Sequence, residues 1–187
     1  MQQISFIESI KKARSYGLEE FLEIMSELSQ ESTKKGHIER KCKELITLGI
    51  ALSKDCHRCI QIHTSEALRL GASETELEQV RKIVLFLNAS PHDNAQLWEA
   101  WEDAWHVFVL GKGPIVQAHR ELIGLAIALV NQRPQLIELH IKCALQYGVS
   151  TQQFFEVMPI ALLMDGAPAL SQIPHLVGAV SAHASAA

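Results

Sequence analysis

The chain has 187 residues, of which 48% are hydrophobic and 20% are charged, and its net charge is −4 at pH 7. This length suits one domain, or two small halves that share a buried core. The small negative charge provides no electrostatic footprint for nucleic acid or an anionic membrane, so we expect neither as a partner. The apolar runs, such as 45–52 and 160–164, are far shorter than the roughly 20 residues of a membrane span. No apolar run follows basic residues at the N-terminus, and the sequence therefore predicts a cytoplasmic protein.

Apolar residues recur at helical spacing almost throughout the chain, and no stretch alternates long enough to indicate a strand. In chain order, the spacing predicts one or two N-terminal helices broken near Gly17, then helices over about 38–52, 56–70, 73–88, 94–110 and 115–130. Asp55 is placed to cap the helix that opens near Cys56, and Gly71 is placed to end it. Three tryptophans lie on one face of the helix over 94–110, which favours core or subunit interface over a cofactor site. The sequence predicts an all-α fold.

The chain contains two copies of one helical unit. When the sequence is shifted by 77 residues, 17 of the 51 positions from 41 to 91 are identical. The matches include Glu44 with Glu121 and His63 with His140, without a gap. The cysteines are not repeated, because Arg133 and Leu136 stand where the first copy has Cys56 and Cys59. Redox chemistry is therefore expected only in the first copy, and the second copy is expected to be scaffold.

This repeat divides the chain into four parts. We expect an N-terminal helical arm over 1–36 and a first unit over 37–92 that carries the cysteine pair. A tryptophan-rich connecting helix over 93–113 and a degenerate second unit over 114–187 follow.

Four cysteines are too few for a disulfide scaffold, and a cytoplasmic compartment keeps thiols reduced. Cys42 and Cys143 are isolated in helical stretches, where a lone cysteine is usually a small buried hydrophobe. Cys56 and Cys59 form a Cys-x-x-Cys pair at a helix start, where the free N–H groups and the helix dipole favour thiolate over thiol. This pair is the candidate site of chemistry.

A histidine and a glutamate are spaced to act on this pair. His63 lies one turn beyond Cys59, so its imidazole can reach that sulfur. Glu44 lies on the preceding helix, and an antiparallel return of the chain brings it level with the second turn of the cysteine helix. A carboxylate there can orient His63 and raise its basicity. Position near the helix start favours Cys56 as the nucleophile, whereas the spacing to His63 favours Cys59, so both stay open.

Two other interpretations of the cysteine pair need weighing. Zinc would need His63 and a further ligand, because the chain has no second Cys-x-x-Cys, so we expect no metal. The pair could also be incidental, with Cys59 buried and inert. No nucleotide, flavin or haem motif is present, and we expect no cofactor.

The pattern Glu44-x11-Cys56-x2-Cys59-x3-His63, set in an all-helical chain, resembles the alkylhydroperoxidase D-like branch of the carboxymuconolactone decarboxylase family. The resemblance implies a peroxidase of the alkylhydroperoxidase D-like helical fold. Cys59 would be oxidised by a small hydroperoxide, Cys56 would resolve it as a disulfide, and Glu44 with His63 would relay the proton. An external dithiol, a lipoyl group or a thioredoxin-like protein would reduce the disulfide, and a homotrimer or homohexamer is implied.

The chain departs from that family pattern at one position. The described alkylhydroperoxidase D proteins have a histidine directly before the second cysteine, where this chain has Arg58. His57 lies one place earlier, about 100° round the helix, and does not replace it. Two other functions remain open beside the peroxidase: a redox-sensing thiol/disulfide module without turnover, and a carboxymuconolactone decarboxylase-type enzyme.

Overall fold

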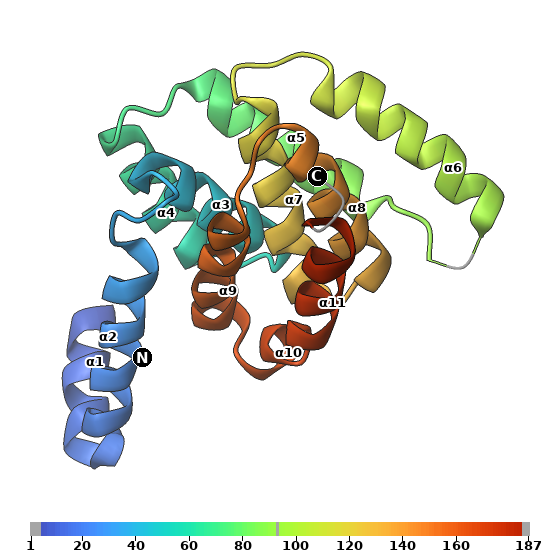
Figure 1. Ribbon diagram of the computed structural model, residues 1–187. Helices are drawn as coiled ribbons and strands as arrows, with labels where there is room; N and C mark the ends of the chain where they lie inside the picture. Colours follow the sequence, from blue (N-terminus) through green and yellow to red (C-terminus); the bar gives the residue numbers. More distant parts are fainter. Residues whose placement is uncertain (1–4, 93, 185–187) are drawn as a thin grey trace.

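A computed structural model describes residues 5–92 and 94–184, and within them the regular structure is helical with no strand (Figure 1). The elements are α1 (Phe6–Ala13), a π-helical turn (Arg14–Leu18), α2 (Glu19–Thr33), α3 (Arg40–Ser53), α4 (His57–Arg69), α5 (Glu74–Asn88), α6 (Ala95–Ala104), a second π-helical segment (Trp105–Leu110), α7 (Gln117–Val130), α8 (Pro134–Gln146), α9 (Thr151–Asp165), α10 (Ala167–Leu170) and α11 (Ile173–Ala184). The predicted all-α fold with two tandem copies is confirmed.

The repeat seen in the sequence is present helix by helix. α7, α8 and α9 begin and end 77 residues after α3, α4 and α5. The turns also match: Gly71 and Gly148 follow equivalent helices with φ of +86° and +77°, a backbone region that favours glycine. Ser73 and Ser150 each make a capping box that starts the third helix of its unit.

One predicted cap is wrong. Asp55 does not cap α4, since the N-cap is Cys56 and no side chain bonds to the first turn. Asp55 instead takes a left-handed backbone conformation with φ of +50°, and its counterpart Gln132 has φ of +52°. Both residues reverse the chain within a tight helix–helix turn. The backbone conformation that this turn requires is not that of an N-cap residue. The first cysteine therefore lies at the N-cap of its helix.

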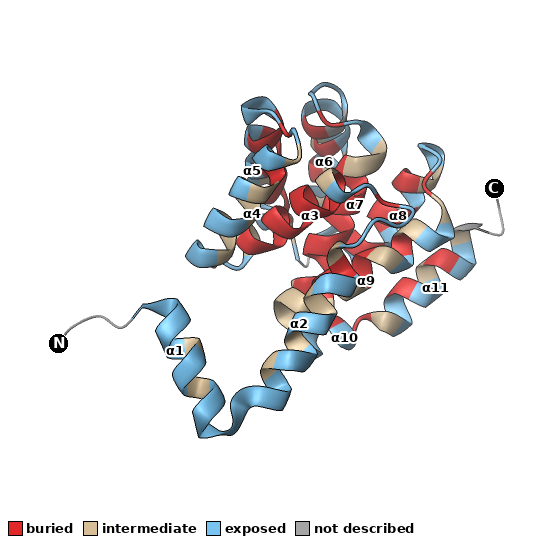
Figure 2. Ribbon diagram, turned by 90° about the vertical axis from the view of Figure 1, so that its left-hand side faces the viewer, coloured by how far each residue is buried: buried red, intermediate tan, exposed pale blue. Residues whose placement is uncertain are grey.

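α3 and α7 form the centre of the core (Figure 2). Every residue of α7 from Arg120 to Val130 is buried, as is α3 from Cys42 to Ala51. The two helices approach closely at Gly49, where a Cβ would lie 3.0 Å from a methyl group of Ile123. α5 and α9 pack across this central pair, and each of them contacts both α3 and α7. The two copies therefore share one core.

Each unit also fastens the loop that leads into the other. Glu156 on α9 accepts the backbone N–H groups of His37 and Ile38 at 2.6 and 3.0 Å. Gln79, the equivalent residue on α5, accepts the N–H of Ile115 at 2.9 Å. Burial alone would raise the pKa of Glu156, but these N–H donors and the buried Lys43 ammonium at 3.2 Å hold it below its usual value. The glutamate is thus kept as a carboxylate that anchors the start of the first unit.

The N-terminal arm projects from this core (Figure 1). α2 packs on α9, whereas α1 has no buried residue and turns away at Gly17, whose φ is +97°. This confirms the predicted break near Gly17. The Phe6 ring of α1 lies 3.7 Å from the guanidinium carbon of Arg58, so the arm touches the first turn of α4.

The tryptophan helix belongs to the core rather than to a cofactor site. Trp101 and Trp105 are buried, and their rings stack with centroids 5.9 Å apart. Phe86 of α5 lies against both rings.

None of the helices in the described part of the chain has the length and apolar character that a membrane span needs.

Candidate functional site

The antiparallel pair α3 and α4 brings Glu44 and His63 together as predicted. His63 Nδ1 lies 2.8 Å from Glu44 Oε2, and the side chains are 15% and 6% exposed. Because a carboxylate oxygen only accepts hydrogen bonds, Nδ1 carries the proton in this pair. Nε2 of the neutral imidazole is then free to accept a proton, and the carboxylate fixes the orientation of the ring. The geometry is that of an oriented general base.

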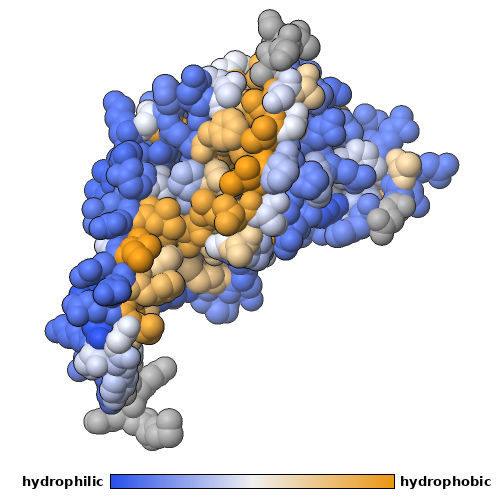
Figure 3. All heavy atoms as spheres, turned by 60° about the horizontal axis from the view of Figure 1, so that its bottom comes forward, coloured by the Kyte–Doolittle hydropathy of each residue, from blue (hydrophilic) through white to orange (hydrophobic). Residues whose placement is uncertain are grey.

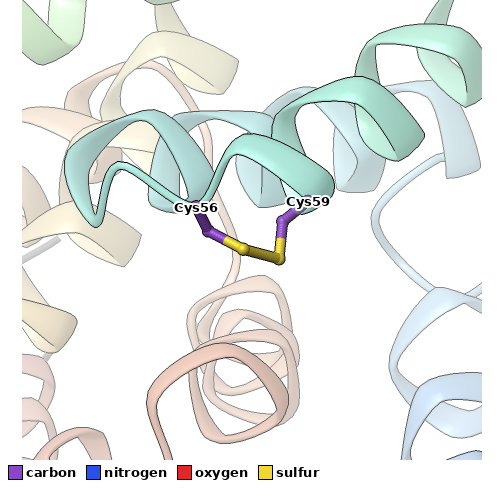
Figure 4. Close-up of a disulfide and its surroundings, with 2 residues drawn as sticks. All are labelled: Cys56 and Cys59. Atoms are coloured by element: carbon purple, nitrogen blue, oxygen red, sulfur yellow. A yellow bond between two sulfur atoms is a disulfide. The ribbon is translucent and has the colours of Figure 1, made fainter. Parts of the chain in front are cut away.

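The two cysteines of the pair are joined by a disulfide (Figure 4). Their Cα atoms lie 5.3 Å apart, and both side chains leave the same side of the first turn of α4. Cys56 and Cys59 are each partly exposed, so dissolved reagents have access to this turn. The first N–H groups of a helix have no partner within it, and they favour a thiolate when the pair is reduced. The pair is therefore capable of reversible thiol/disulfide chemistry.

The other two cysteines are unsuited to such chemistry. Cys42 on α3 and Cys143 on α8 are buried free thiols. Burial raises the pKa of each to about 12, so both stay protonated near neutral pH. The expectation that they are small buried hydrophobes is confirmed.

The second copy keeps the glutamate–histidine pair and seals it. His140 Nδ1 lies 2.6 Å from Glu121 Oε2, and both side chains are fully buried. The indole N–H of Trp105 donates to the other oxygen of Glu121 at 3.3 Å, and its ring packs edge-on against His140 at 5.1 Å. Trp105 therefore covers the glutamate–histidine pair of the second unit.

Helical periodicity alone does not predict the contact of Trp105 with Glu121 and His140. Trp105 was expected in the core or at an interface, but its bond to Glu121 depends on how the π-helical segment is placed against α7. Gly124, which gives His140 its room, differs from Thr47 in the first copy, and that difference was the available signal.

The remaining residues of the motif lie outside the pair. His57 and Arg58 are exposed on the first turn of α4. Across residues 5–92 and 94–184, no group of three or more His, Cys, Asp and Glu side chains is arranged to hold a metal ion.

Comparison with known proteins identifies the class. The model of the carboxymuconolactone decarboxylase family matches residues 19–103 and again residues 95–177. The chain therefore belongs to the carboxymuconolactone decarboxylase family, with two copies of the family unit. Each match begins earlier than the units expected from the repeat, at 37 and 114, and so takes in α2 and α6.

The individual relatives are less informative. The chain is 35% identical over 60 residues to an uncharacterized protein of Cupriavidus necator, covering 32% of this chain and 53% of that protein. The chain thus spans about half the length of the curated relative that it matches. No solved structure matches the chain.

Proposed function

We propose that the protein is a cysteine-based alkyl hydroperoxide reductase of the alkylhydroperoxidase D-like type. One observation carries the proposal: His63, hydrogen-bonded to Glu44 of α3, lies on α4, the helix whose first turn holds a disulfide-forming cysteine pair. The second copy has the same glutamate–histidine pair but no cysteine pair. The thiols are therefore what distinguishes the first site from the second.

The proposed reaction starts from the reduced pair. His63 Nε2 accepts the proton of the Cys59 thiol, and the thiolate attacks the terminal, hydrogen-bearing oxygen of a small hydroperoxide. The S–O bond forms as the O–O bond breaks, and the leaving alkoxide takes the proton from His63 and departs as an alcohol. Cys59 is then a sulfenic acid.

The second half of the cycle regenerates the thiols. His63 accepts the proton of the Cys56 thiol, the resulting thiolate attacks the sulfur of the sulfenic acid, and the S–S bond forms as the S–O bond breaks. The leaving hydroxide takes that proton from His63 and departs as water. An external dithiol, either a lipoyl group or a thioredoxin-like protein, reduces the disulfide by exchange and is itself oxidised. Two electrons pass from the dithiol to the peroxide, and the chain returns to its reduced state.

The proposal is tested by measuring consumption of hydrogen, cumene and tert-butyl hydroperoxides with dihydrolipoamide as the reductant. We expect turnover in the wild type and none in Cys59→Ser, because serine forms no sulfenic acid. Cys143→Ala is the matched control, since its thiol is buried and protonated, and it should keep wild-type turnover. Wild-type protein without turnover on any of the three peroxides would contradict the proposal.

One contact favours the second candidate, a thiol/disulfide switch without turnover. Arg58 lies between the two cysteines and holds the ring of Phe6 at 3.7 Å, so a change in the first turn of α4 is transmitted to α1. A disulfide that forms reversibly without peroxide turnover would favour this switch. The same preparation assayed with carboxymuconolactone covers the activity that names the family, and turnover there would favour the decarboxylase.

We propose that the chain acts as a homotrimer or homohexamer. An apolar stripe crosses the face shown in Figure 3. Large apolar side chains at least 40% exposed on the helices of this side are Phe21, Ile24, Phe155, Leu170 and Val177, on α2, α9, α10 and α11. A stripe that joins several helices in this way is typical of a surface buried against another chain.

Light scattering at micromolar concentration tests the assembly. We expect a mass near three or six times that of the 20.8 kDa chain. Replacing Phe21 and Ile24 with glutamate should shift the protein to smaller species, because charges would then lie in the buried interface. Leu85→Glu, at an exposed apolar position on α5, is the control that should keep the assembly. A monomeric wild type would contradict this proposal.

A further inference from the structure

The two glutamate–histidine pairs lie at different depths although their helices are in register. His140 and Glu121 are fully buried, whereas the side chains of His63 and Glu44 are 15% and 6% exposed. Both pairs use the same atoms, Nδ1 and Oε2, at 2.6 and 2.8 Å. Trp105 covers the second pair, and a second cause lies on the helix that carries the glutamate.

On α7 the cause is a glycine. A Cβ built on Gly124 would lie 2.5 Å from Cε1 of His140 and 2.7 Å from each ring nitrogen. Contacts below 3.0 Å essentially do not occur for real Cβ atoms. The imidazole of His140 therefore rests directly on the backbone of α7, in space that exists only because residue 124 has no side chain.

On α3 the equivalent residue is Thr47. Its side chain is 1% exposed, and its hydroxyl donates to the backbone carbonyl of Lys43 at 2.8 Å. By the register of the repeat, the Cβ of Thr47 corresponds to the place on α3 that the imidazole of His140 occupies on α7. We therefore expect this Cβ to keep His63 from the depth of His140.

We propose that Thr47 is a positioning residue, whose Cβ holds the imidazole of His63 away from α3 and on the accessible side of α4. Cys59 and His63 are four residues apart on α4, so an imidazole held outward stays on the face that carries the thiol. The role in catalysis rests on the proposed function, but the placement of the ring does not. In the second unit the arrangement is the opposite: Gly124 lets the imidazole of His140 lie against the backbone of α7, and Trp105 covers it.

The placement is tested by labelling histidines with diethyl pyrocarbonate in wild type, Thr47→Ala and Thr47→Gly, with mass spectrometry to resolve each residue. His63 should react in wild type and in Thr47→Ala, which keeps the Cβ. In Thr47→Gly the ring should sink against α3, and its labelling should fall at least threefold. The buried His140 is the internal reference, and its protection shows that each variant is folded. Equal labelling of His63 in the alanine and glycine variants overturns the proposal.

The consequence for the thiol is measured separately. In a reduced Cys56→Ser background, alkylation of Cys59 by iodoacetamide at pH 7 should slow severalfold in Thr47→Gly, with the pH profile displaced to higher pH. Thr47→Ala should restore the wild-type profile. Ala126→Gly on α7 is the control for the cost of a glycine in a buried helix, and it should leave the profile unchanged. If Thr47→Gly has the same pH profile of Cys59 alkylation as the wild type, the link between Thr47 and the thiol is overturned.

Both readouts are independent of peroxide turnover, so a failure of the peroxidase proposal is distinguishable from a failure of this one. Should Thr47→Gly not fold, the wild type itself provides the test. Contact between the two side chains predicts a nuclear Overhauser effect between the protons of Thr47 and the ring protons of His63. Its absence in the folded protein overturns the proposal.

Discussion

Glu44→Gln and Glu121→Gln, the same substitution in the two copies, should have opposite consequences. We expect Glu44→Gln to lower peroxide turnover on the order of 100-fold, within the range for loss of general acid–base catalysis. The amide can donate as well as accept, so it no longer selects the tautomer of His63 with a free Nε2. The fold should change little, because glutamine has nearly the same shape and its amide oxygen can still accept the Nδ1–H of His63. Steady-state rates with dihydrolipoamide, beside thermal unfolding of the same samples, measure both effects.

In the second copy the same change should act on stability. Glu121 accepts two donors in a fully buried place, the indole N–H of Trp105 and the Nδ1–H of His140. Glutamine has one acceptor oxygen, so one of these donors is left without a partner. A flip of the His140 tautomer does not help, because Nε2 is itself buried without a partner and would then carry a proton. An unsatisfied buried donor costs about 1–3 kcal/mol, and we expect the free energy of unfolding to fall by about that amount with turnover retained.

This pair of variants has a clear contradictory outcome. Equal loss of turnover in both would mean that the second copy takes part in the chemistry. No loss of turnover in Glu44→Gln would remove the proton relay from the proposed mechanism. Circular dichroism of both proteins separates a catalytic effect from unfolding.

Much of the fold could be predicted because the repeat is regular. A shift of 77 residues without a gap fixes two copies of three helices, and the capping boxes at Ser73 and Ser150 mark the same helix start in each. The pairing of Glu44 with His63 also follows from the sequence, since two helices joined by a short turn must run antiparallel. These features are local or periodic, and such features are expressed directly in the order of residues.

The features that were missed depend on tertiary placement. The bond from Trp105 to Glu121 joins a π-helical segment to the middle of α7, and periodicity does not specify how those elements cross. Asp55 was expected to cap α4, but a tight turn needed a left-handed residue there, and the turn decides its conformation. The functional roles of Cys56 and Cys59 in turnover stay predictions, because bonding between them establishes proximity and not direction of attack.

Gly124→Ala should be among the most destabilising single-methyl additions available in this chain. The new Cβ would lie 2.5 Å from the His140 ring, and the ring is held on its other sides by Glu121 and Trp105. Relief requires α7 and α8 to separate or the Glu121–His140 bond to break within the core. Overpacking of a dense core costs about 1–3 kcal/mol, which corresponds to a fall in melting temperature of about 2–4 °C per kcal/mol at this chain length.

Gly178→Ala on α11 is the matched control, because nothing lies within 4 Å of its Cβ. That variant should be neutral or more stable, since alanine favours a helix over glycine by up to about 1 kcal/mol. Thermal unfolding by circular dichroism compares the two, and equal melting temperatures would show that the His140 ring is not packed on the α7 backbone.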